Sequence, residues 1–141
     1  MIPDPWDFMA KELSDVMLVR HRIPEPGRYY HDQRTIVVRC GLAIHEERRF
    51  LWHEIVHALR GDETCDLPWL RAKAEASAER EAARRAMPLS VLEDALERSA
   101  DWWDFADALK VPEPWVRFRI DIAHPAERAL LSRVHRWENT A

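Results

Sequence analysis

The sequence predicts an α+β fold in which a small three-stranded antiparallel sheet packs on two helices and a helical C-terminal region follows. Three observations lead to this prediction. Short apolar stretches between residues 16 and 40 are separated by prolines and a turn, as β-strands are. Apolar residues recur at helical spacing within 48–61. An alanine-rich stretch, 66–88, ends at a proline, which stops a helix.

The length of 141 residues predicts one domain, 1–141, with a core over 1–88 and a helical extension over 89–141. Ahead of the central helix we expect a short helix and three strands, the first strand stopped by Pro24 and Pro26. An edge strand of such a sheet is a surface on which a substrate peptide can be held extended by main-chain pairing. These elements are expected at 4–14 (helix) and at 16–23, 27–32 and 35–40 (strands).

The central helix carries an H-E-x-x-H motif, His53-Glu54-Ile55-Val56-His57. Residues four positions apart lie on one face of a helix, so both imidazoles can reach the same Zn²⁺. Glu54 lies one step round from His53, where it can act as the general base for a water molecule activated by the metal. The motif therefore predicts a zinc hydrolase, most simply a peptidase.

The surrounding residues fit a helix that turns these histidines away from the core. Gly61 is expected to end this helix. An apolar stripe on the opposite side is expected to pack on the core, and its members are Leu51, Ile55, Ala58 and Leu59.

The alanine-rich stretch predicts a second helix, with Asp66 as its N-cap, Pro68 in its first turn and Pro88 at its end. Glu75 and Glu79 lie one turn apart on a face of small residues that another helix can approach closely. An unpaired carboxylate would be costly on such a packing face.

We therefore predict that Glu75 is the third zinc ligand. Glu79 is predicted to accept the free N–H of a ligating histidine. The reverse assignment, with Glu79 as the ligand, stays open.

Three stretches of the sequence resemble the ImmA/IrrE family of zinc metallo-endopeptidases, in its small phage or actinobacterial form. Residues 35–39 with 47–57 resemble the strand, basic run and zinc helix of that family. Residues 75–88 resemble its pattern of a glutamate followed by a stretch that ends in Met-Pro, and 105–119 resemble the segment after its zinc domain. The resemblance covers roughly residues 15 to 120.

The sequence departs from the family pattern at two positions. Glu79 stands where the family usually has Asn or Asp. Trp52 stands where a small residue is usual, which predicts a tighter pocket beside the ligands.

The resemblance implies a zinc-dependent endopeptidase that cuts a regulatory protein at one site, often a helix-turn-helix repressor, and so switches a phage or stress programme. A peptidase of this kind needs a donor for the oxyanion besides the metal. The sequence offers four candidates without choosing among them, namely Tyr29, Tyr30, His31 and Arg117. Three histidines outside the motif, His21, His31 and His45, are given no metal role.

Composition narrows the choice of partner. The formal net charge of −4 does not favour binding to a nucleic-acid backbone. No apolar run approaches the ~20 residues of a membrane span, and the acidic, proline-broken start predicts no signal peptide.

Two cysteines, Cys40 and Cys65, fit a reducing cytoplasm. Cys65 is interpreted as a small packing thiol, although it could approach the metal. The oligomeric state is left open.

Two rival functions are considered. In one, the zinc site serves a protein that binds a repressor and inactivates it without cutting. In the other, residues 101–120, which have a helix-turn-helix character, read DNA, although four acidic residues among them argue against this. Helices of the C-terminal region are expected at 89–98, 101–110, 113–121 and 125–137.

Overall fold

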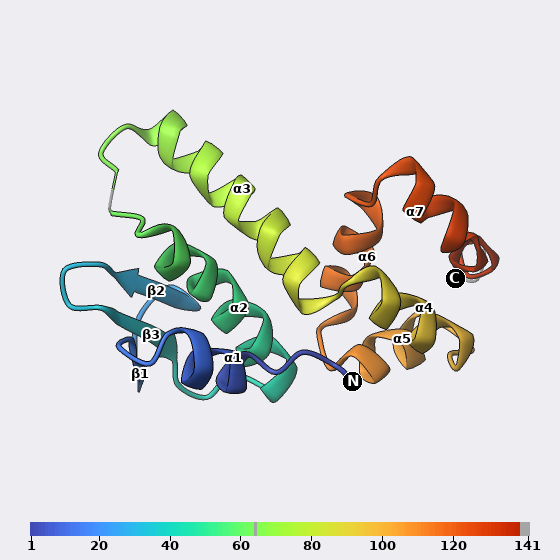
Figure 1. Ribbon diagram of the computed structural model, residues 1–141, viewed down its shortest axis with the longest axis horizontal. Coiled ribbons are helices and arrows are strands. Elements are labelled where there is room, and N and C mark those ends of the chain that lie inside the picture. The colour runs from blue at the N-terminus through green and yellow to red at the C-terminus, as the bar shows by residue number, and fades with distance from the viewer. Residues whose placement is uncertain (64, 139–141) are drawn as a thin grey trace.

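The computed structural model describes residues 1–63 and 65–138 and has an α+β architecture (Figure 1). Helix α2 lies in the middle of the N-terminal part, with the sheet and α1 on one side and α3 on the other (Figure 1). In chain order the elements are α1 (Pro5–Glu12), β1 (Met17–His21), β2 (Gly27–Tyr30), β3 (Thr35–Arg39), α2 (Ile44–Arg60), α3 (Pro68–Ala86), α4 (Leu89–Glu97), α5 (Trp102–Leu109), α6 (Glu113–Asp121), α7 (Pro125–Leu130) and the 3₁₀ helix η1 (Ser132–Arg136).

The sheet is mixed, so the prediction of a purely antiparallel sheet was wrong. Its strand order is β1-β3-β2, with β1 parallel and β2 antiparallel to the central strand β3. Pro24 and Pro26 favour an extended connection after β1, so this connection spans the width of a strand instead of making a hairpin. Strand β3 then returns between the other two and buries Ile36 and Val38 completely. This order leaves β2 at an edge of the sheet.

Helix α2 begins at Ile44 without a side-chain cap and ends at Arg60, where Gly61 follows as the C-cap with a φ of 67° in the left-handed region. Leu51 and Ile55 are fully buried, as the predicted apolar stripe requires. Leu59 was wrongly included in that stripe, because its side chain is 38% exposed. Periodicity identifies a face of a helix but not how far along the helix other elements cover it.

Trp52 also differs from its predicted place beside the metal ligands. It is buried in the core, and its ring packs against Phe8 of α1 with centroids 5.5 Å apart. Its bulk therefore fills the gap between α1 and α2 and does not narrow the pocket.

Helix α3 packs on α2 through its C-terminal half, where the small side chains Ala78, Ala82 and Ala86 are buried. Its N-cap is Leu67, so the predicted cap at Asp66 was wrong. Pro68 favours the first helical position, which makes the residue directly before it the cap.

The C-terminal region packs on α3 through α6. Arg119 of α6 is buried and donates from Nε to the main-chain oxygen of Met87, at 2.9 Å. The predicted helix over 125–137 is instead the short helix α7 followed by η1. Among the helices in the described ranges, none combines the length and apolar character needed to cross a membrane.

These burial differences predict unequal losses of stability. Leu51→Ala should lower the free energy of unfolding by about 2–5 kcal/mol, because it leaves a cavity in the core. Leu59→Ala should lower it by only about 0.5–1 kcal/mol, because much of this side chain already meets water. Urea denaturation of both variants measures the difference, and equal losses would contradict the assigned burial.

Candidate metal centre

Two neighbouring helices bring together three side chains that could hold a metal ion. His53 and His57 lie one turn apart on α2, and Glu75 reaches them from α3. Oxygens of Glu75 lie 2.7 Å from Nε2 of His53 and 3.1 Å from Nε2 of His57. One ligand atom from each of the three residues lies within 4.8 Å of the other two. The three residues that the sequence predicts as zinc ligands thus lie together in the structure.

The chemistry of this group fits a divalent zinc ion. Two imidazole nitrogens and one carboxylate are a donor set of catalytic zinc sites, in which a fourth position stays open. The Nε2 atoms of His53 and His57 lie 3.1 Å apart and both face Glu75. A cation between these atoms would receive lone pairs from all three side chains, so Nε2 is the ligating atom that the geometry favours on both rings.

Each imidazole has a second carboxylate on its other nitrogen. Oε2 of Glu79 lies 2.7 Å from Nδ1 of His53, as an ion-pair contact rather than a well-aligned hydrogen bond. Oδ2 of Asp62 lies 2.9 Å from Nδ1 of His57. Carboxylates in this position fix the tautomer and the orientation of ligating histidines. Glu79 thus lies where its predicted role requires, whereas Asp62 was not predicted.

The end of α2 explains why Asp62 reaches His57. The N–H of Gly61 binds the oxygen of Ala58, and the N–H of Asp62 binds the oxygen of His57 at 3.0 Å. This is the Schellman arrangement, which reverses the chain over the last helical turn. An Asp directly after a helix-ending Gly, five positions after a histidine, is the sequence signal that identifies such a partner.

The carboxylates control the protonation of the histidines. Burial by itself disfavours the charged form of His53, but Glu75 and Glu79 outweigh it and raise the pKa of His53 to about 10. Burial also opposes protonation of His57, whereas Glu75 and Asp62 favour it, and the pKa of His57 is raised. The two histidines in turn hold the pKa of Glu75 well below its usual range.

Glu54 lies beside this group and faces the sheet. Its side chain is buried, and burial raises the pKa of its carboxyl group to about 7, although His53 and His57 oppose the shift. A Cβ atom added to Gly27 of β2 would lie 3.1 Å from Cγ of Glu54. The absence of a side chain at Gly27 therefore gives Glu54 the room for its present position.

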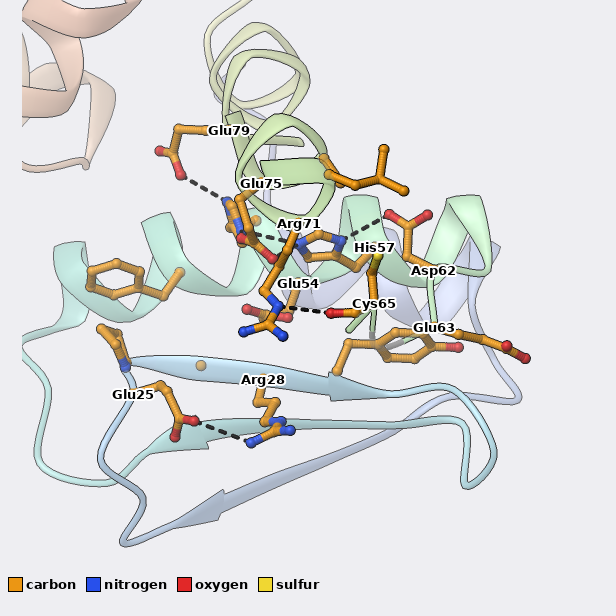
Figure 2. A pocket seen from close by; sticks show the side chains of 17 residues that line it. Glu25, Arg28, Glu54, His57, Asp62, Glu63, Cys65, Arg71, Glu75 and Glu79 are labelled. Carbon is orange, nitrogen blue, oxygen red and sulfur yellow. Dashed lines mark hydrogen bonds and ion pairs between the residues drawn. The ribbon is translucent and has the colours of Figure 1, made fainter. Parts of the chain in front are cut away.

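The group opens into a cleft of about 770 Å³ between α2, α3 and β2. Figure 2 shows Glu75 and His57 pointing toward one another, with Glu54 between α2 and the nearest strand. Phe50 and Leu70 add apolar surface to the walls, and Arg71 stands over the cleft and donates from Nε to the main-chain oxygen of Cys65 (Figure 2).

The free edge of β2 borders the same cleft. Strand β2 pairs only with β3 in the described part of the chain. The N–H of Arg39 in β3 binds the oxygen of Pro26, at 2.9 Å. In an antiparallel pair every second residue is bonded in this way, so the main-chain groups of Gly27 and Tyr29 point away from β3. Gly27 and Tyr29 also line the cleft, which places unpaired main-chain groups along it.

The four sequence candidates for oxyanion binding are placed differently. Of these described residues, Tyr29 alone lines the cleft, and its hydroxyl group is hydrogen-bonded to His31 and Arg34. Tyr30 lies under the guanidinium of Arg28, and Arg117 of α6 pairs with Glu113. Two arginines, Arg28 and Arg71, line the cleft, and sequence reasoning missed both. For Arg71, the position one turn before Glu75 on the same helix was the available signal.

A comparison with models of known protein families finds no match to this chain, and a comparison with curated proteins finds none either.

The raised pKa of His53 predicts proton release on zinc binding. At pH 7 the metal-free protein holds a proton on His53, because its pKa is about 10, and zinc binds only the neutral ring. The apparent zinc affinity should therefore rise with pH from 7 to about 10. Calorimetric titration at pH 7 in two buffers of different ionisation enthalpy measures the released protons. The Glu79→Gln variant should release fewer protons, because it lacks one of the carboxylates that raise the pKa of His53. Zinc uptake without proton release would contradict a protonated His53 in the metal-free protein.

Proposed function

We propose that the protein is a zinc-dependent endopeptidase. The observation that carries the proposal is the convergence of His53, His57 and Glu75 beside the buried Glu54, in a cleft bordered by the free edge of β2. His53, His57 and Glu75 would hold the ion. When bound, zinc would supply Lewis-acid polarisation of the scissile carbonyl group and lower the pKa of a water molecule.

The residues of the chain do the remaining work. Glu54 takes the proton of the attacking water and passes it to the leaving amine, and a pKa of about 7 suits a group that must do both near neutral pH. Glu79 and Asp62 hold the two ligating rings in orientation. Of the two arginines that line the cleft, Arg28 pairs with Glu25, so we assign Arg71 to the developing negative charge.

The substrate proposed for this cleft is an extended stretch of protein. The main-chain groups of Gly27 and Tyr29 would pair with it as an added strand, a mode of recognition that depends little on side chains. Phe50 and Leu70 would contact its side chains. The identity of the substrate as a helix-turn-helix repressor rests on the sequence resemblance alone. A cytoplasmic location is part of the same proposal and is supported by the free cysteines Cys40 and Cys65.

DNA binding through residues 101–120 is the weaker function. Arg117 pairs with Glu113 and covers the ring of Trp102, with 4.5 Å between its guanidinium carbon and the ring centroid. Arg119 is buried and bonded to the main chain of Met87. Both arginines of this segment are therefore engaged within the protein.

Glu54→Gln tests the chemistry. The amide keeps the size of the side chain but cannot accept the proton, so zinc content should stay and peptide cleavage should fall about 10²–10⁴-fold. Elemental analysis measures the zinc, and mass spectrometry of a peptide library measures new chain ends. Glu63→Gln, another carboxylate of the cleft wall, is the matched control and should cleave as wild type.

The same variant separates cleavage from capture. If Glu54→Gln still relieves repression in cells as well as wild type does, the protein acts by binding its target, and the peptidase proposal fails.

Gly27→Ala tests the space around Glu54. The new methyl group would lie 3.1 Å from Cγ of Glu54, so this side chain must shift by a few tenths of an ångström. Because a misplacement of about 1 Å can cost about 10²-fold in rate, a shift of a few tenths of an ångström should lower cleavage about two- to tenfold while zinc content stays the same. Unchanged cleavage rates would show that Glu54 does not act from this position.

A further inference from the structure

The carboxylate of Glu79 connects the candidate metal centre with the C-terminal helical region. One oxygen, Oε2, lies 2.7 Å from Nδ1 of His53. The other, Oε1, accepts a hydrogen bond of 2.5 Å from the indole N–H of Trp115, which lies on α6. A residue 36 positions further along the chain thus shares a carboxylate with one of the proposed ligands.

Trp115 is fixed in place and so fixes the carboxylate. Its side chain is only 1% exposed, because α6 packs it against α3. Arg49 of α2 lies over the ring of Trp115, with 5.8 Å between its guanidinium carbon and the ring centroid, and places Nε 3.7 Å from Oε1 of Glu79. A buried N–H that meets a carboxylate makes a charge-assisted hydrogen bond, which is stronger than one between neutral groups. Glu79 is therefore held from two sides while its free oxygen faces His53.

We infer that Trp115 is a positioning residue for the metal centre, which acts through Glu79 on the orientation of His53. This inference rests on the proposed metal centre but not on peptidase activity. The C-terminal helical region is then part of the site, since α6 supplies the contact. By linkage, zinc binding must strengthen the docking of α6 on α3 by the same free energy with which that docking strengthens zinc binding.

The chain offers a matched control for the indole N–H. Trp102 is also buried in the C-terminal region, but its Nε1 has no hydrogen-bond partner within the described ranges. Replacing either tryptophan with phenylalanine keeps an aromatic ring and removes one N–H. The two substitutions are alike in lost packing and differ in the bond to Glu79.

The test measures zinc affinity by competition with a chromophoric chelator. Trp115→Phe should bind zinc about tenfold more weakly than wild type, as is typical when a partner of a ligating histidine is disturbed. Trp102→Phe should bind zinc as wild type does. Equal affinities of wild type and Trp115→Phe would overturn the inference, and so would equal losses in both variants, which would mark a general effect of packing.

A double-mutant cycle tests the route through Glu79. In a Glu79→Gln background, Trp115→Phe should weaken zinc binding much less than it does in wild type, because the two side chains act as one unit. An undiminished effect would mean that Trp115 acts by another route and would overturn the inference.

If Trp115→Phe does not fold, nuclear magnetic resonance of the wild-type protein tests the inference through the indole N–H signal of Trp115. It should shift on zinc binding while that of Trp102 does not, and an unmoved Trp115 signal overturns the inference.

The outcomes separate this inference from the proposed function. Tight zinc binding that depends on Trp115, in a protein that cuts no peptide, would keep the inference and reject the peptidase. Peptide cleavage by a protein whose zinc affinity does not depend on Trp115 would keep the peptidase proposal and reject the inference.

Discussion

The close approach of α2 and α3 is the constraint on which the rest of the structure depends. Ala78, Ala82 and Ala86 present almost no bulk toward the neighbouring helix, so the two backbones can pack closely. The same face of α3 carries Glu75, about one turn before Ala78, and Glu79, which lies between Ala78 and Ala82 along the chain. Larger residues in the alanine positions would hold the helices apart and withdraw both carboxylates from the histidines. The position of the site is therefore set by packing before it is set by charge.

The negative charges around His53 and His57 then favour a cation at this group of side chains. Three carboxylates, Glu75, Glu79 and Asp62, contact two partly or fully buried imidazoles. Without a metal, this arrangement draws protons onto the rings, which is the cause of the raised pKa values. A divalent ion would supply the same positive charge at one point and would leave the Nδ1 hydrogens for the outer carboxylates. Burial of the ionisable groups is thus compatible with a stable fold in either form.

Features that depend on residues close in the chain could be predicted from the sequence. The spacing of His53 and His57 on a helix, and that of Glu75 and Glu79 on the next, follow from the geometry of one helical turn. The α+β class followed from the spacing of apolar residues and the placement of prolines, and the structure confirms it. These features need no knowledge of how distant segments meet.

Features that depend on distant segments were not predictable in this way. The position of β3 between β1 and β2 depends on how a short connection crosses the sheet, and the pattern of apolar residues is the same for either strand order. Trp115 meets Glu79 only because α6 packs on α3. Leu59 has the spacing of a core residue, but its exposure depends on which elements cover that end of α2.

Solvent reaches the three donors unequally. The side chain of Glu75 is 52% exposed, whereas those of His53 and His57 are 12% and 9% exposed. An ion that enters or leaves would therefore pass along α3 and meet the carboxylate before either ring. Exchange of the ion with solvent would then depend on this exposed glutamate, so a substrate lying across the cleft would also slow the loss of the metal.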